Sequence, residues 1–244
     1  MIKMVAAMRR KPGMTHAECL QYVEHTHGAI SRIKPLGLKK YMQNHVFDGA
    51  FGAESDTGYH QTFHRDSITE LYFDDYAGLI ETFSDPHTQQ KVGPDGANFA
   101  DLTRQAAQLM SEREIKVPTP GKGGVKVMHF LKQAPGVDLL AFVSAWEIAH
   151  QAAQQQCPEF AQAVRRHVRA EYIPEGDRIT AYFGPDIEVH QGLASFWFED
   201  ERDLTTFRAY QRLLMRLLGE DGVVEPQGSF FVYAREVSII GGEA

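Results

Sequence analysis

Histidines are the residues of this chain best suited to proton chemistry: eleven occur among 244 residues, although the formal net charge is −7. His27 follows Val23 by one helical turn, and His150 follows Trp146 at the same spacing, so each imidazole would share a helix face with an apolar residue. A partly buried neutral imidazole beside an apolar ligand can exchange a proton near pH 7, as isomerisation or decarboxylation without a cofactor requires. The alternative is a structural histidine at a helix C-terminus, where the helix dipole favours it.

Two residues of one predicted strand could assist His27. Residues 38–47 alternate loosely between apolar and polar, and Tyr41 and His45 have the same parity, so both would lie on one face of the strand. We therefore predict that His27, His45 and Tyr41 carry the catalysis. The alternative for His45, and for His167 on the matching strand of the second half, is a core histidine bonded to a backbone carbonyl.

A long loop is predicted over residues 48–66, which are rich in Gly, Asp, Ser and Thr. Tyr59, His60 and His64 lie in this loop and are predicted to bind substrate, because binding residues concentrate on loops. His60 and His64 are four residues apart, a spacing that suits a metal only on a helix, and their neighbours do not favour a helix. We therefore expect no metal site.

Asp85 and His87 follow a helix predicted over residues 74–83 and place a carboxylate beside an imidazole. We predict that both contribute to substrate binding. The structural alternative is that Pro86 only ends the helix and Asp85 caps the segment that follows it.

Two stretches of the chain carry the same pattern, which indicates a tandem duplication. Residues 2–27 align with residues 125–150 at an offset of 123 without a gap, and 71–75 align with 196–200 at an offset of 125. This period is too long for a solenoid, whose repeats reach about 50 residues. Each copy should therefore be a domain, with the boundaries 1–117 for the first repeat, 118–124 for a Pro- and Gly-rich linker and 125–244 for the second repeat.

Each repeat is predicted to contain the order β-α-β-β-α-β, the ferredoxin-like arrangement. In the first repeat Thr15 and Glu18 form a capping box at a helix start. The other elements expected there are strands at 3–8, 38–47, 67–73 and 112–117, the helix at 74–83 and an extra helical stretch at 99–110. The second repeat should have strands at 125–132, 164–173, 190–198 and 228–239, helices from 138 and at 201–218, and a loop at 174–188.

A four-stranded sheet with helices on one face leaves its other face bare and apolar, so the two repeats should pack sheet to sheet. The fold class is therefore α+β, a pseudo-twofold α/β barrel of two ferredoxin-like repeats within one chain. Tyr72 and Trp197 occupy equivalent strand positions, as do Phe73 and Phe198. Since neighbours on a strand face opposite sides, one aromatic of each repeat should line the barrel and the other should pack on helices. We include Tyr72, Trp197 and His150 among the predicted substrate-binding residues.

The composition is that of an ordinary globular protein, with 43% hydrophobic and 23% charged residues. Its basic clusters are short and scattered, so nucleic-acid binding is not expected. No apolar run has the length of a membrane span or a signal peptide, and the two cysteines occupy non-equivalent positions in the two repeats. We therefore expect a soluble cytoplasmic protein without a membrane partner. Glycine motifs for nucleotide cofactors and serine elbows are lacking, and no cofactor is expected.

The first repeat resembles the EthD-domain proteins. The resemblance rests on Arg-Lys-Pro-Gly-Met-Thr-His-Ala-Glu at 10–18, His27-Gly28 at the helix end, Tyr72-Phe73, Ser84-Asp85-Pro86 and residues 99–112. The second repeat resembles a diverged copy, which keeps Pro135-Gly136 and His150. The resemblance implies the dimeric α/β barrel fold and a small hydrophobic or aromatic ligand in the barrel. Relatives include accessory proteins of ether degradation, a muconolactone methylisomerase and fungal decarboxylases of polyketide pathways.

The function expected from these residues is acid/base catalysis on a small aromatic, polyketide-like or lactone substrate, of the isomerase, cyclase or decarboxylase type, with His27 as the main acid or base. One alternative is a non-catalytic protein that binds a small molecule or haem for an oxygenase system. Another is an oxidoreductase of the antibiotic-monooxygenase type. A monomer suffices for the barrel and a homodimer is possible. The His-rich first repeat should carry the active pocket, and the second should be mainly structural.

Overall fold

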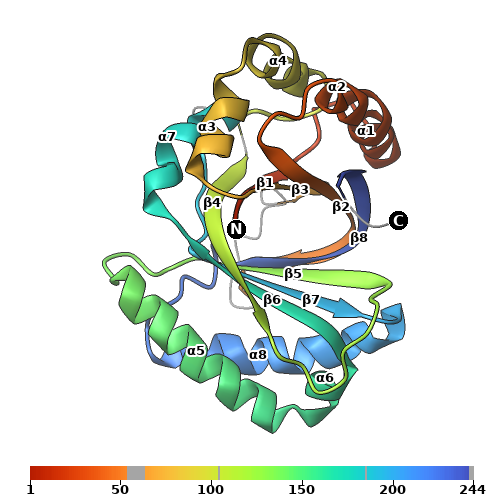
Figure 1. Ribbon diagram of the computed structural model, residues 1–244. Coiled ribbons are helices and arrows are strands. Elements are labelled where there is room, and N and C mark those ends of the chain that lie inside the picture. The colour runs from red at the N-terminus through yellow and green to blue at the C-terminus, as the bar shows by residue number, and fades with distance from the viewer. Residues whose placement is uncertain (54–63, 104, 185, 242–244) are drawn as a thin grey trace.

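The computed structural model describes residues 1–53, 64–103, 105–184 and 186–241. Its eight strands form one closed barrel of antiparallel strands in the order β1-β3-β2-β8-β5-β7-β6-β4 (Figure 1). The strands are β1 (Ile2–Met8), β2 (Leu38–Phe51), β3 (Ser67–Phe73), β4 (Ala106–Ile115), β5 (Val125–Leu131), β6 (Val164–Tyr172), β7 (Gly192–Phe198) and β8 (Phe230–Ile240).

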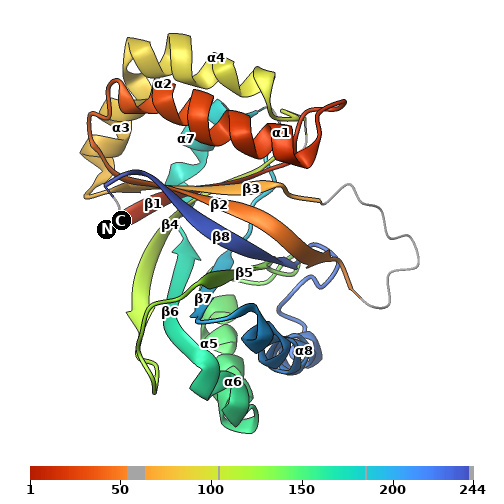
Figure 2. The ribbon, with the colours of Figure 1, turned by 90° about the vertical axis from the view of Figure 1, so that its right-hand side faces the viewer.

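Helices cover the barrel on two opposite sides, as Figure 1 and the turned view of Figure 2 show. In the first repeat they are α1 (His16–Gln21), the π-helical stretch Tyr22–His27, α2 (Gly28–Arg32), α3 (Tyr76–Ser84), a second π-helical stretch Thr88–Val92, α4 (Gly93–Asp95) and the 3₁₀ turn Gly96–Asn98. In the second repeat they are α5 (Leu139–Gln156), α6 (Pro158–Ala163), α7 (Asp177–Thr180), α8 (Leu204–Glu220) and the 3₁₀ turns Pro174–Gly176, Ala181–Phe183 and Glu201–Asp203. No helix of the described residues is long and apolar enough to span a membrane.

The predicted α/β barrel is confirmed. The sheet of the first repeat has the order β4-β1-β3-β2 and that of the second has β8-β5-β7-β6, so the repeats share one topology. The sheets join edge to edge at both seams, where β2 pairs with β8 and β4 with β6. The chain thus closes by itself the barrel that two copies of a single repeat would form.

Local signals in the sequence account for several element boundaries. Thr15 Oγ1 accepts a hydrogen bond from the Glu18 amide (3.2 Å), and Glu18 Oε2 accepts one from the Thr15 amide (2.8 Å), so the predicted capping box is confirmed. In the second repeat the Asp138 side chain caps α5 through the amides of Leu140 and Ala141. The predicted strand at 67–73 coincides with β3.

Two elements lie at other residues than the sequence predicts. Residues 99–110 do not form a helix: the helical turns precede them, over residues 88–98, and β4 begins at Ala106. The first residues of β4 are buried on both sides, so no alternation of polar and apolar residues marks them as a strand. The loop expected from residue 48 begins later, because β2 continues to Phe51 in its pairing with β8.

Alternate residues of each strand face the barrel interior. Val5, Ile68, Met110, Met128 and Phe130 belong to one buried cluster that joins both repeats inside the barrel. Tyr72 and Trp197 lie on the interior side, where they donate to Glu70 (3.2 Å) and Glu236 (2.6 Å). Phe73 and Phe198 belong to the clusters beneath the helices, as predicted. The barrel interior is therefore packed core.

Candidate functional site

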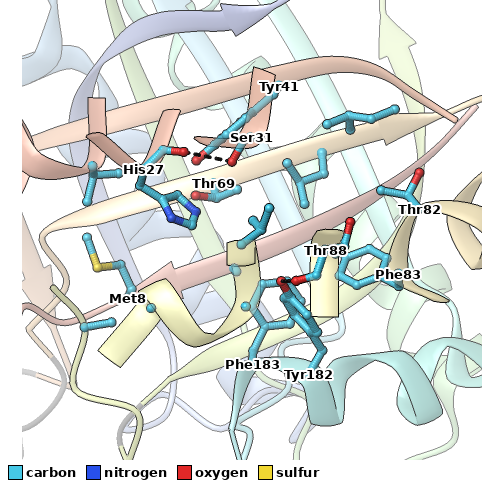
Figure 3. Close-up of a pocket in the computed structure, with 18 of the residues that line it drawn as sticks. Met8, His27, Ser31, Tyr41, Thr69, Thr82, Phe83, Thr88, Tyr182 and Phe183 are labelled. Carbon is cyan, nitrogen blue, oxygen red and sulfur yellow. Dashed lines mark hydrogen bonds between the residues drawn. The ribbon is translucent and has the colours of Figure 1, made fainter. Parts of the chain in front are cut away.

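A cavity of about 120 Å³ lies on the outer face of the first repeat's sheet, beneath the helices of that repeat (Figure 3). Its floor includes Ala6, Met8, Thr69 and Leu71 from β1 and β3, whose neighbours along each strand face the barrel interior. The cavity is thus outside the barrel, which corrects the expectation of a ligand within it. The physical reason is that side chains of both repeats fill the interior, whereas short helical turns roof the outer face.

His27 ends the π-helical stretch Tyr22–His27 and lines this cavity. Its Nδ1 lies 2.9 Å from Asp95 Oδ2, and its ring packs against Phe99 with centroids 4.8 Å apart. π-Helical turns are rare and occur frequently at functional sites. Since the carboxylate accepts a hydrogen bond from Nδ1–H, the neutral imidazole keeps an unprotonated Nε2. His27 is therefore equipped to act as a general base.

Asp95 lies at the end of α4 and is held by three hydrogen bonds. Besides His27, it accepts from the Tyr22 hydroxyl (2.7 Å) and the Asn98 amide (2.9 Å). Burial opposes its ionisation, but these donors together hold the pKa of Asp95 below its usual value. Burial also lowers the pKa of His27, and Asp95 offsets this only in part. Near neutral pH the pair is thus an ionised carboxylate beside a neutral imidazole.

Tyr41 also lines the cavity and is connected to His45 through Gln43. The Gln43 amide nitrogen donates to the Tyr41 hydroxyl (3.0 Å), and the Gln43 carbonyl oxygen lies 3.0 Å from His45 Nε2. Burial raises the pKa of Tyr41, so its phenol stays protonated and can donate a hydrogen bond. His45 itself does not line the cavity; it lies on the same face of β2 and contacts the site only through Gln43.

The second repeat supplies one wall of the cavity. Tyr182 and Phe183, from the 3₁₀ turn Ala181–Phe183, line it, and the Tyr182 ring packs edge-on against Phe83 with centroids 4.9 Å apart. The Tyr182 hydroxyl donates to the Thr88 carbonyl (3.3 Å), and Figure 3 shows these side chains on one side of the cavity. We expected residues 174–188 to be only a loop. An aromatic pair in a polar segment was the available signal for this contact.

Several predicted binding residues lie away from the cavity. Asp85 accepts from the His87 amide (2.8 Å) and pairs with Lys34 (2.5 Å), so it acts as a cap beside a lysine that lines the cavity. His87 Nε2 contacts the Ile30 carbonyl oxygen (3.0 Å). His64 lies at the surface, 3.4 Å from Asp66. Tyr72 and Trp197 face the packed barrel interior, and Tyr59 and His60 lie outside the described residues.

His150, the counterpart of His27, lies in a packed aromatic core. Its Nδ1 lies 2.6 Å from the Tyr210 hydroxyl, and its ring lies 4.8 Å from that of His167. Phe160 stacks on Tyr210 with centroids 4.0 Å apart. Long helices and large aromatic side chains therefore fill, in the second repeat, the space that the first repeat leaves open.

The buried histidines of the second repeat should make the fold acid-sensitive. Burial lowers the pKa of His129 to about 3 and those of His150 and His190 to about 4. An unfolded histidine has a pKa of about 6.5, so the unfolded chain binds more protons below that pH. The stability from these neutral histidines is fully present above pH 6.5 and is lost as the pH falls towards 4, by up to about 3 kcal/mol per histidine.

Urea unfolding at pH 7.5 and 5.5 measures this loss. His129→Leu should reduce the pH dependence, whereas the control His25→Asn, at a side chain 67% exposed, should leave it unchanged. An equal pH dependence in wild type and His129→Leu would contradict the assignment.

Among the described residues, no group of three or more His, Cys, Asp or Glu side chains is placed to hold a metal ion. A haem also does not fit the cavity as it stands, because a macrocycle of four pyrrole rings far exceeds a space of about 120 Å³. Such a ligand would displace Phe83, Tyr182 and Phe183 from the wall.

Comparisons with known proteins concern the first repeat and the fold of the whole chain. Residues 11–103 match the EthD domain, and this range contains His27, Tyr41 and Asp95. The conidial pigment biosynthesis dehydratase EthD of Metarhizium robertsii is 26% identical over 113 residues, which cover 41% of this chain and 74% of that protein. The chain is thus a distant homologue of that enzyme.

Solved structures resemble the whole chain at low sequence identity. A Fusobacterium nucleatum protein assigned as a monooxygenase aligns over 100% of this chain and 95% of its own, with a TM-score of 0.53 and 8% identity. A protein assigned as a chlorite dismutase aligns over 98% and 96%, with a TM-score of 0.50 and 11% identity. These likenesses concern the fold alone. The chain thus contains an EthD domain at residues 11–103, and its two repeats form a dimeric-type α/β barrel.

Proposed function

We propose that this protein is a cofactor-independent acid/base enzyme that removes water from a small aromatic, polyketide-like substrate in the His27 cavity. The observation that carries the proposal is the His27–Asp95 pair, which presents an imidazole to an enclosed, largely apolar cavity. The distant dehydratase relative favours loss of water over the isomerase, cyclase and decarboxylase reactions that use the same proton transfer.

The pair suits proton abstraction next to a carbonyl group. Nε2 of His27 takes a proton from the carbon beside the carbonyl, and the electron pair of that C–H bond forms a new C=C bond. The C–O bond to a hydroxyl on the next carbon breaks, and the hydroxide leaves as water with the proton carried by His27. Asp95 holds the imidazole in one tautomer and stabilises the imidazolium, and the Tyr41 phenol donates to the carbonyl oxygen as its charge develops.

The cavity limits the substrate to a compact ring system. An engineered cavity of about 150 Å³ with apolar walls binds benzene, and the cavity here measures about 120 Å³. A single ring therefore fits without rearrangement. A bicyclic substrate would require the aromatic side chains Phe83, Tyr182 and Phe183 to shift.

The test uses single-ring β-hydroxy ketones such as 5-hydroxycyclohex-2-enones, which fit the cavity and whose dehydration completes one aromatic ring. Wild-type protein should release water from at least one of them and should exchange the proton next to the carbonyl with solvent deuterium, both followed by mass spectrometry. The proposal is overturned if the protein catalyses neither dehydration nor exchange above the rate in buffer.

Asp95→Asn should lower kcat by about 10- to 100-fold with little change in KM, because Asp95 orients the base without lining the cavity. Asp95 raises the pKa of His27, so its replacement should move the acidic limb of the pH–rate profile to lower pH. Asn98→Ala, which removes one donor to Asp95, is the milder comparison. A profile unchanged in Asp95→Asn would show that Asp95 has only a structural role.

A further inference from the structure

A second hollow, of about 450 Å³, is lined by residues from the end of β2, the start of β8 and α8. Figure 2 shows these elements at one end of the barrel. We call the hollow the α8 groove; Phe51, Phe230, Phe231, His129, Arg208 and Arg216 are among its lining residues. Apart from β2, whose start lines the His27 cavity and whose end lines this groove, the two are formed by different elements. The α8 groove is therefore a separate candidate site.

One wall of the groove carries arginines at helical spacing. Arg208, Arg212 and Arg216 are four residues apart on α8, so they lie on one face of that helix, and all three line the groove. The Arg208 guanidinium lies 4.6 Å from the Phe231 ring centroid and donates to Gln211 (2.9 Å). Its position is thus fixed by an aromatic ring and a neutral amide.

Arg208 and Arg216 have no counter-charge among the described residues that line the groove. No carboxylate is among the described residues that line it, and within that part of the chain neither Arg208 nor Arg216 takes part in an ion pair. The whole chain has a net charge of −7, so a concentration of arginines at one hollow runs against its overall charge. Guanidinium groups bind carboxylate and phosphate through paired hydrogen bonds. The wall is thus suited to an anion.

His129 adds a buried polar side chain to the wall of the groove. Its side chain is 1% exposed and lines the groove, and its Nδ1 has no hydrogen-bond partner among the described residues. A buried polar atom without a partner is destabilising. Phe230 and Phe231 line the same groove, and aromatic side chains in such a wall can pack against another planar ring.

We infer that the α8 groove binds a planar aromatic molecule carrying an anionic group, with its ring on the phenylalanines and its anion at Arg208 and Arg216. This site is separate from the His27 cavity and does not depend on the reaction proposed there. An aryl carboxylate and an aryl phosphate present the same chemistry to the arginines, so the probes must distinguish them.

Isothermal titration calorimetry of the purified chain with 2-naphthoate, 2-naphthyl phosphate and uncharged 2-naphthol tests the site. We expect at least one anion to bind at least tenfold more tightly than 2-naphthol, and the tighter of the two identifies the anionic group. Arg216→Gln, at an exposed position, should weaken that binding severalfold, and Arg208→Met with Arg216→Gln should weaken it at least tenfold.

Two control variants keep the result specific. Arg202→Gln changes an exposed arginine just before α8 that pairs with Asp200, and should bind as the wild type does. His27→Ala should also bind normally, because His27 lies in the other cavity. Circular dichroism confirms that each variant is folded. The inference is overturned if 2-naphthol binds as tightly as the anions, if no probe binds, if the arginine variants bind normally, or if His27→Ala abolishes binding.

Discussion

His27→Ala is expected to lower turnover by about a hundredfold or more, because the variant lacks the group that takes the proton. The fold should change little. His27 is 14% exposed within a helix that continues into α2, and Asp95 keeps its bonds from Tyr22 and Asn98, so we expect a loss of stability of about 1 kcal/mol. Turnover, solvent deuterium exchange and urea unfolding measure the two effects separately.

His25→Ala is the matched control for this variant. It lies on the same helical turn, two residues away, but its side chain is 67% exposed and does not line the cavity. We expect it to retain wild-type turnover. Undiminished turnover in His27→Ala, or an unfolded variant, would remove His27 from the catalytic role.

Lys126→Met is expected to reduce the free energy of unfolding by about 3–5 kcal/mol, because it breaks a buried charge network. Lys126 Nζ lies 2.5 Å from Glu70 and 3.0 Å from Glu236, and Lys3 pairs with Glu70 (2.7 Å) and Glu112 (2.8 Å). Burial alone would raise the pKa of Glu70, but Lys126 and Lys3 hold it well below its usual value. Without Lys126, the fully buried Glu70 would have to share Lys3 with Glu112. Glu236 would lose its ion pair with Lys126.

A double variant separates loss of the charge pair from loss of packing. Glu70→Gln in the Lys126→Met background removes the charge left without its partner, so the double variant should be more stable than the sum of the single changes predicts. Chemical denaturation of the four proteins gives the coupling energy. If the two effects simply add, the ion pair does not account for the loss. The catalytic turnover that depends on His27 should persist in the folded fraction of each variant.

The two repeats have kept the barrel and diverged beneath the helices. Lys3 and Lys126 occupy equivalent positions and both contribute to the network inside the barrel. His27 and His150 are equivalent too, yet one pairs with Asp95 beside a cavity and the other bonds to Tyr210 in a packed core. Both sheets must meet at the shared interior, which restrains change there. Each helical layer packs mainly on its own sheet and is therefore freer to change.

Much of the fold and part of the site could be predicted from the sequence, because they depend on local patterns. The aligned stretches predicted two repeats, the capping box at Thr15 and Glu18 predicted the first helix, and an apolar neighbour one turn earlier predicted that His27 faces inward. The two-residue repeat of a β-strand correctly predicted that Tyr72 and Phe73 face opposite sides of the sheet. These features require only that neighbouring residues obey helix or strand geometry.

The tertiary structure alone decided where the cavity lies and what completes it. Strand periodicity separates two faces of a sheet but does not say which face is filled, and the free space proved to be on the helix side. Asp95 reaches His27 across 68 positions of sequence through short helical turns that lack a regular apolar pattern. Tyr182 and Phe183 come from the other repeat. Such contacts depend on how elements pack in space, and packing is set by the volumes of side chains distant in the sequence rather than by their spacing along it.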